Sequence, residues 1–363
     1  MKRLLFIISR FLINQLYVQI GYSNNMPVNT LHDYPKGISE VIFSMTKDFP
    51  NNSQLSIAII ENNKTSYYGI IKTNDTIKPI NNQNKVFEIG SITKVFTSSI
   101  LASFVVDDEI KLTDPINSCF PFLFNNNTKI TFKDLANHTS GLSRMPENLD
   151  LSNAINPYKN YGENQLEEFL KYHIKLENGI NKSYYYSNLG AGLLGYTLGL
   201  VVNTSIQELT QRLIFDRYKM HNSYTKPNNL DSMLVKGQNP EGEIASNWDW
   251  DVLFGAGGAL STTEDLAKFS EAHFNPDNTE LALTRIPTFS INENLKIGLG
   301  WHIIKSNKGK DIFVHNGGTG GYSSSIAINK DDKAAVVILS NVSGFHQKMN
   351  NIEKLCLLLL LNQ

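Results

Sequence analysis

Phe87-Glu88-Ile89-Gly90-Ser91-Ile92-Thr93-Lys94-Val95-Phe96 is the stretch from which the fold and the chemistry of this chain can be inferred. Gly90 permits a sharp backbone turn because it has no Cβ to clash. The residues after it predict a helix to about Val106 with one apolar face. Ser91 would begin this helix, with Lys94 one turn later on the same face. A serine needs a neighbouring base to become a nucleophile, and a lysine with a lowered pKa can be that base.

A second S-x-x-K sequence shows that this spacing alone is weak support. It reads Ser44-Met45-Thr46-Lys47 and lies within residues 38–49, which have the pattern of an ordinary amphipathic helix. No glycine and no strand precede it. The context therefore favours Ser91, and the hypothesis needs partners for this serine elsewhere in the chain.

The composition excludes several classes of protein. The chain has 363 residues, 41% of them hydrophobic, which is enough for one large or two modest cores. Its net charge is −1 without long charged runs, so nothing indicates a nucleic-acid partner. The eight histidines are scattered, and we expect neither a metal site nor a cofactor. Cys119 and Cys356 are too few for a disulfide scaffold; they could pair, but buried free thiols are favoured.

The N-terminus predicts an export signal. A charged start, Met1-Lys2-Arg3, is followed by the apolar residues 4–8, and the segment would end near residues 21–25. Residues 1–25 would then be a signal peptide, and the mature protein periplasmic or secreted. The alternative is an amphipathic N-terminal helix packed on the protein or on a membrane surface.

Strand patterns at both ends of the chain enclose a helical middle. Expected strands cover 54–60, 65–71, 299–305, 311–315, 323–329 and 334–340, with a polar loop at 72–85; expected helices cover 130–138, 165–172, 189–202, 262–269 and 348–361. The simplest architecture is of the α/β (α+β) class, an antiparallel sheet flanked by helices with an inserted helical lobe. Residues 26–363 would form one domain, with an α/β lobe at about 26–110 and 286–363 and a helical lobe at about 111–285. A small-molecule site is expected between the lobes.

Tyr186-Ser187-Asn188 is the first candidate partner of the serine. A phenol beside a lysine ammonium can have a lowered pKa and pass protons, and the asparagine amide can bridge the lysine and a substrate carbonyl. Tyr158-Lys159-Asn160 matches the same pattern and is more simply interpreted as a loop.

The second candidate partner is His315-Asn316-Gly317-Gly318-Thr319-Gly320-Gly321, at the end of an expected strand. Its glycines would let a substrate backbone lie close to this edge. The N–H of Gly318 could form an oxyanion hole with the N–H of Ser91. His315 would present a donor or a positive charge to a substrate carboxylate. The alternative is a glycine-rich turn with a surface histidine.

Together, S-x-x-K, Y-x-N and H-x-G in this order resemble the serine β-lactamase and penicillin-binding-protein superfamily, in which S-x-x-K is a defining motif. The chain looks most like the branch of class C β-lactamases and D-Ala-D-Ala carboxypeptidases. Segments 135–142 and 255–262 are also similar, so the resemblance covers roughly residues 35–345. It implies a β-lactamase-like fold with Ser91 as nucleophile, Lys94 and Tyr186 as acid and base, and substrate binding by Asn188, His315, Gly317 and Gly318.

One departure from the family pattern bears on the substrate. Class C β-lactamases have Lys-Thr-Gly at the third motif, where this chain has His315-Asn316-Gly317. Histidine there resembles D-Ala-D-Ala carboxypeptidases and D-aminopeptidases, so the resemblance implies a serine hydrolase of peptides that contain D-residues. Ester or β-lactam substrates are alternatives. An alternative of another class is an inactive relative that binds peptidoglycan fragments or a protein partner.

Overall fold

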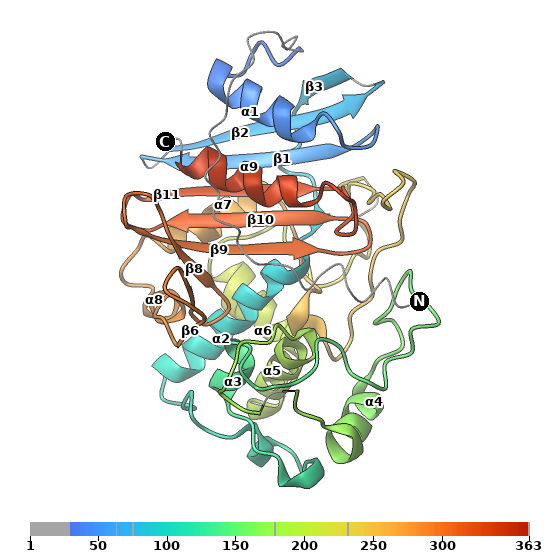
Figure 1. Cartoon of the computed structure of the whole chain (residues 1–363), viewed down its shortest axis with the longest axis vertical. Coiled ribbons are helices and arrows are strands. Elements are labelled where there is room, and N and C mark those ends of the chain that lie inside the picture. The colour runs from blue at the N-terminus through green and yellow to red at the C-terminus, as the bar shows by residue number, and fades with distance from the viewer. Residues whose placement is uncertain (1–29, 63, 75, 178, 231, 362–363) are drawn as a thin grey trace.

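A large antiparallel sheet built from both ends of the chain forms the framework of the molecule (Figure 1). The computed structural model describes residues 30–62, 64–74, 76–177, 179–230 and 232–361. Within them the sheet has nine strands in the order β3-β2-β1-β11-β10-β9-β8-β7-β6. The strands are β1 (Gln54–Glu61), β2 (Lys64–Thr73), β3 (Thr76–Ile80), β6 (Phe289–Ser290), β7 (Leu295–Ile297), β8 (His302–Lys305), β9 (Asp311–Gly318), β10 (Ser323–Asn329) and β11 (Ala334–Ser340).

The two chain ends meet at the pairing of β1 with β11. Leu55 lies opposite Ser340 and Ile60 opposite Ala335, and both strands are almost fully buried. The alternation of side chains in a strand then supplies apolar residues to both faces of the sheet. This confirms the predicted antiparallel sheet.

Helices from the two ends cover one face of the sheet. These are α1 (Lys36–Thr46) and α9 (Asn350–Leu361), which lie in front of the sheet in Figure 1. Helix α9 contacts α1, β10 and β11, and its buried residues include Ile352, Leu355 and Leu359. The leucine-rich end of the chain is therefore a helix buried against the sheet, as its pattern predicted.

The middle of the chain packs on the opposite face and below the sheet. Its helices are α2 (Thr93–Val106), α3 (Phe132–Ala136), α4 (Glu163–Glu168), α5 (Asn188–Val201), α6 (Ile206–Thr210), α7 (Thr263–Ala272) and α8 (Thr279–Thr284). Single helical turns lie at η1 (Gly90–Ile92), η2 (Ile116–Cys119), η3 (Asn125–Asn127), η4 (Phe169–His173), η5 (Gln211–Asp216) and η6 (Phe254–Ala256). A short pair, β4 (Phe87–Glu88) with β5 (Leu260–Ser261), leads into η1 and α2. Helix α7 packs against β1 and β11, although its sequence falls in the predicted helical lobe.

Helix α2 differs from its predicted form. We expected one apolar face, but every residue from Thr93 to Phe104 is buried. The helix lies between the sheet and the other helices and contacts α3, α5, α6 and α8. A helix covered on all sides needs no polar face, and small hydroxyl residues along it bond to the backbone one turn earlier, as Ser99 does to Val95.

Other differences from the expected elements are local. The polar loop expected at 72–85 contains β3, and the short strands β6 and β7 were not predicted. Strand β8 begins at His302 rather than at residue 299. Thr131 caps α3 as predicted, in a reciprocal box with Asp134. The strands that were not predicted are short. Their extended conformation comes from pairing with neighbouring strands rather than from an apolar pattern of their own.

Both cysteines are free thiols, with Cys356 buried and Cys119 partly exposed. In the described part of the chain, no single helix is long and apolar enough to cross a membrane. The helical segments Asn188–Val201 and Ile206–Asp216 have the length and composition of a membrane span only when they are taken together, and they are bent by 88° relative to each other. The predicted signal peptide, residues 1–25, lies outside the described residues.

Candidate active site

Ser91 lies on a tight turn between β4 and α2. Gly90 has φ +50°, which favours glycine, and a Cβ on it would lie 2.7 Å from the backbone nitrogen of Gly318. The turn therefore carries Ser91 directly beside the end of β9. Ser91 remains partly exposed, whereas the residues that follow it are buried. This exposure leaves its hydroxyl open to a substrate.

Lys94 lies beneath this hydroxyl in the protein interior. Its Nζ is 3.0 Å from Ser91 Oγ, 2.9 Å from Asn188 Oδ1 and 2.7 Å from the carbonyl oxygen of Ala256. Burial, and then the charge of Arg144, hold the pKa of Lys94 well below its ordinary value. The predicted contact between lysine and serine is present. The sequence analysis did not identify Ala256 as a contact, although it quoted the segment 255–262.

Tyr186 reaches the same hydroxyl from the segment before α5. Its phenol interacts with the Ser91 hydroxyl, and Lys94 Nζ lies 4.8 Å from the centre of its ring. The predicted lowering of its pKa is wrong. The protein packed around the phenol raises the pKa of Tyr186 to about 12, even though part of the ring reaches the surface; the hydrogen bond with Ser91 acts in the opposite direction and is the smaller effect. At neutral pH the phenol is therefore protonated and is a donor.

Asn188 is the first residue of α5 and is fixed from both ends of its amide. Oδ1 accepts from Lys94, while Nδ2 donates to the hydroxyl of Tyr158 at 3.0 Å. Tyr158 in turn stacks on Trp250, with ring centres 4.1 Å apart. Tyr158 does lie in a loop, as predicted, but we missed its buried contact with the site. The Y-x-N match that begins at Tyr158 could have pointed to this residue. The local sequence does not show, however, that the tyrosine of this match bonds to the asparagine of the other one.

The end of β9 forms the opposite wall. Strand β8 pairs with β9 only as far as Val314, so residues 315–318 extend beyond that pairing and lie against η1. A Cβ on Gly317 would lie 2.0 Å from the carbonyl oxygen of Ile89, so the turn before Ser91 can approach only a glycine. The predicted closeness of Gly317 and Gly318 to Ser91 is present in the structure.

His315 is near the site, but its predicted positive charge is contradicted. Its ring lies 6.4 Å from that of Tyr186, and its Nδ1 lies 2.7 Å from the carbonyl oxygen of Asn316. It is buried, so the alternative of a surface histidine is also wrong. Burial, followed by the neighbouring His302 and Lys94, holds the pKa of His315 well below its ordinary value. The imidazole is therefore neutral at neutral pH.

Arg144 is a third residue whose place in the site the sequence analysis missed. Its guanidinium carbon lies 5.2 Å from the centre of the Tyr186 ring, and its carbonyl oxygen accepts the backbone N–H groups of Asn188 and Leu189 at 2.9 and 3.2 Å. The bonds to its main chain tie the loop of Arg144 to the start of α5. In addition to the buried Lys94, the site therefore contains a guanidinium cation, that of Arg144, which lies on the ring of Tyr186.

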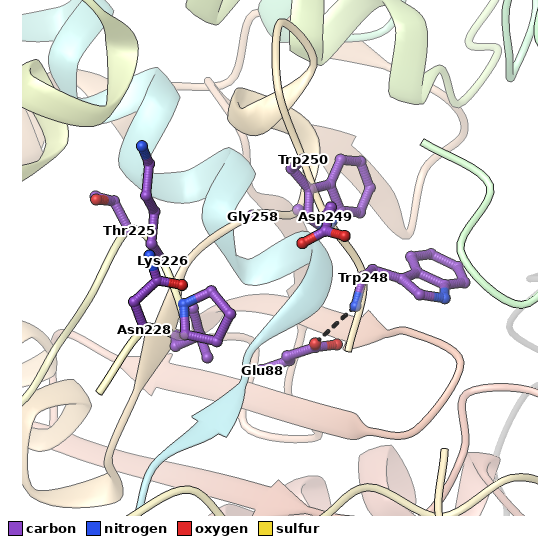
Figure 2. Close-up of a pocket in the computed structure, with 11 residues that line it drawn as sticks. Glu88, Thr225, Lys226, Asn228, Trp248, Asp249, Trp250 and Gly258 are labelled. Atoms are coloured by element: carbon purple, nitrogen blue, oxygen red, sulfur yellow. Dashed lines mark hydrogen bonds between the residues drawn. The ribbon is translucent and has the colours of Figure 1, made fainter. Parts of the chain in front are cut away.

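A cavity of about 250 Å³ lies beside the active site, with Glu88 at its base (Figure 2). Trp250, which stacks on Tyr158, forms part of its wall, and neither Ser91 nor Lys94 lines it. Glu88 Oε1 accepts from the backbone N–H of Trp248 at 3.0 Å. This hydrogen bond connects β4, the strand before Ser91, to the loop that carries Trp248 and Trp250.

This chain is similar in sequence to known proteins. The family model described as "Beta-lactamase" matches residues 47–358. The chain belongs to the β-lactamase family. A "Beta-lactamase" from Pseudomonas fluorescens is 24% identical over 260 residues, covering 69% of each protein. A "Beta-lactamase-like protein 2" from Dictyostelium discoideum is 28% identical over 250 residues, covering 64% of this chain but 44% of that protein.

Solved structures of the family have the same fold. A "Beta-Lactamase/D-Alanine Carboxypeptidase" from Pseudomonas syringae superposes with a TM-score of 0.75 at 21% identity, covering 89% of this chain and 97% of that one. A class C β-lactamase from Rhodobacter sphaeroides gives 0.74 at 17% identity, covering 89% and 99%. The predicted β-lactamase-like fold is confirmed. At these identities the likeness establishes the fold and leaves the substrate open, although the family fits β-lactam or peptide substrates.

Proposed function

We propose that this protein is a serine hydrolase that works through an acyl-enzyme and cleaves small peptides containing D-residues, as a D-Ala-D-Ala carboxypeptidase or D-aminopeptidase does. The hydrogen bonds of Lys94 carry the proposal. A neutral amine has two N–H donors and one lone pair. The carbonyl oxygens of Asn188 and Ala256 use both donors, so the lone pair is left for the hydroxyl proton of Ser91. The lowered pKa of Lys94 supports this neutral form.

In the proposed reaction, Ser91 Oγ forms a bond to the substrate carbonyl carbon while its proton passes to Lys94. The resulting oxyanion would accept from the N–H groups of Ser91 and Gly318. Collapse breaks the bond to the leaving group, which takes a proton from the Tyr186 phenol. The proton held on Lys94 then passes to the neighbouring Tyr186 phenolate and restores the phenol. Water releases the acyl group by the reverse transfers. A phenol with a pKa of about 12 suits Tyr186 to this donor role, because it enters the reaction protonated.

The third motif favours D-peptides over penicillins as substrates. This chain has His315 where class C enzymes have lysine, and one of the relatives with the same fold, from Pseudomonas syringae, is described as both a β-lactamase and a D-alanine carboxypeptidase. Esters and β-lactams remain candidate substrates because the same nucleophile and oxyanion hole would serve them. The choice among them is a matter for a direct hydrolysis panel.

Covalent labelling tests the nucleophile. A fluorophosphonate or a fluorescent penicillin should label the wild-type protein, and Ser91→Ala should abolish the label. Ser44→Ala, in the second S-x-x-K, is the matched control and should label normally, because Ser44 donates to Val41 of its own helix at 2.9 Å. A panel of D-Ala-D-Ala peptides, D-amino-acid amides, nitrophenyl esters and a chromogenic cephalosporin then identifies the substrate. Absence of labelling by both probes would favour the inactive peptidoglycan- or protein-binding relative.

We also propose export through residues 1–25, on the sequence pattern alone. Mass spectrometry of the full-length protein expressed in a bacterial host should find a mature chain that begins near residues 21–26. An intact N-terminus on the exported protein would contradict cleavage.

A further inference from the structure

The third motif was expected to supply a donor or a positive charge to a substrate carboxylate, and it supplies no positive charge. His315 Nδ1 lies against a carbonyl oxygen, which only accepts, so Nδ1 carries the proton of the neutral ring. Nε2 is then an acceptor and cannot donate to a carboxylate. Lys94 already bonds to Ser91, Asn188 and Ala256 inside the protein. Neither residue is left to bind an anionic substrate.

Arg144 supplies such a charge. Its side chain is partly exposed, and its guanidinium has no hydrogen bond or ion pair with any residue that the structure describes. Its loop is nevertheless well fixed, because its carbonyl oxygen accepts two N–H groups from α5 and the preceding Ser143 carbonyl accepts from the Ser187 hydroxyl at 2.7 Å. A cation on a fixed loop that lies on the ring of Tyr186, with its donors unused, is pre-organised for an anion.

The position of Arg144 indicates which part of the substrate it meets. Its guanidinium lies on the ring of Tyr186, the phenol proposed to protonate the leaving group. A carboxylate on the leaving group would therefore lie closest to it. We infer that Arg144 binds the carboxylate of the leaving group, so that the preferred substrates are acyl-D-amino acids and peptides with a free C-terminal carboxylate. This inference rests on the proposed function.

A matched pair of substrates tests it. Acyl-D-alanine esters of 3-hydroxybenzoate and of 3-hydroxybenzamide differ only in whether the leaving group carries a carboxylate. The ratio of their kcat/KM values isolates the contact with Arg144, because any effect of this residue on Lys94 acts on both esters. A hydrogen-bonded charge pair predicts a ratio of about 10 to 100 in the wild-type protein. In Arg144→Gln the ratio should fall to near one, and Arg144→Lys should give an intermediate value.

Two results would overturn the inference while leaving the proposed function intact. The first is a ratio of the two kcat/KM values near one in the wild-type protein, a result that does not depend on whether any variant folds. The second is a ratio in Arg144→Gln that equals the wild-type ratio. Arg212→Gln, at an exposed arginine in η5, is the control and should keep the wild-type ratio. If neither ester is hydrolysed and no probe labels Ser91, the proposed function itself fails, and the inference fails with it.

Discussion

Replacing Glu88 by glutamine tests how the protein holds the turn before the nucleophile. Oε1 of this carboxyl accepts from Asn247 Nδ2 at 2.6 Å and from the Trp248 N–H at 3.0 Å, and the Thr319 hydroxyl also interacts with the carboxyl. Oε2 is buried without a hydrogen-bond partner of normal length. Burial raises the pKa of Glu88 from 4.5 to about 7. Glutamine keeps the shape and the accepting oxygen but cannot ionise.

The sign and size of the effect follow from the two pKa values. A carboxyl whose pKa is higher in the folded state binds its proton more tightly there, so the free energy of unfolding falls as the pH rises between the unfolded and folded values. For Glu88 the fall begins near 4.5 and is complete above about 7. At about 1.4 kcal/mol for each pH unit, the total loss is about 3 kcal/mol. Relative to wild type, Glu88→Gln should therefore gain most of this amount between acidic and mildly alkaline pH.

Urea unfolding at a series of pH values measures this difference. The buried histidines also titrate, but they are common to both proteins and cancel when the two curves are subtracted. Glu109→Gln, at an exposed residue after α2, is the control and should follow the wild-type curve. Parallel curves for Glu88→Gln and wild type would show that Glu88 ionises in the folded protein as it does in water, and would refute the argument.

Three further substitutions test other parts of the site. Lys94→Ala should slow acylation of the nucleophile by about 100- to 10,000-fold in a labelling time course, whereas Lys47→Ala in the second S-x-x-K should have no effect; equal rates in the two variants would exclude the proposed base. Tyr158→Phe removes the acceptor of a buried amide and should lower the free energy of unfolding by about 1–3 kcal/mol in urea, and unchanged stability would mean that water replaces the hydroxyl. Gly317→Ala would place a Cβ 2.0 Å from a backbone oxygen and should greatly lower the melting temperature; Gly37→Ala, where no atom lies within 4 Å, is the control, and equal melting temperatures would contradict the close packing.

The sequence predicted those elements whose apolar pattern repeats over several residues. Strands β10 and β11 were predicted with their observed bounds, and β1 to within one residue, because each is long and buried along most of its length. Strands β6 and β7 have two and three residues. So short a segment carries no measurable period, and its conformation is set by hydrogen bonding to the neighbouring strand.

The motif residues were predicted, but several of their partners and charge states were not. The Lys94 acceptor on Ala256 and the tyrosine that holds Asn188 are far from these residues in sequence, and only the fold brings them together. The pKa of Tyr186 and the neutral His315 depend on how much protein surrounds each ring, because desolvation here exceeds the effect of nearby charges. A linear sequence contains the identity of a titratable group but not its burial.

The two S-x-x-K sequences of this chain separate the effect of spacing from the effect of surroundings. In α1 the hydroxyl of Ser44 donates to the backbone of its own helix, and Lys47 is exposed, so its ammonium is hydrated. In α2 the same spacing places the lysine inside the protein, where burial favours the neutral amine and two carbonyl oxygens occupy both of its N–H groups. In the neutral form that we propose for Lys94, the lone pair is then directed at Ser91, whose Oγ lies 3.0 Å from Nζ. The proposed reactivity of Ser91 therefore comes from the segments packed around α2, and the motif contributes only the two side chains.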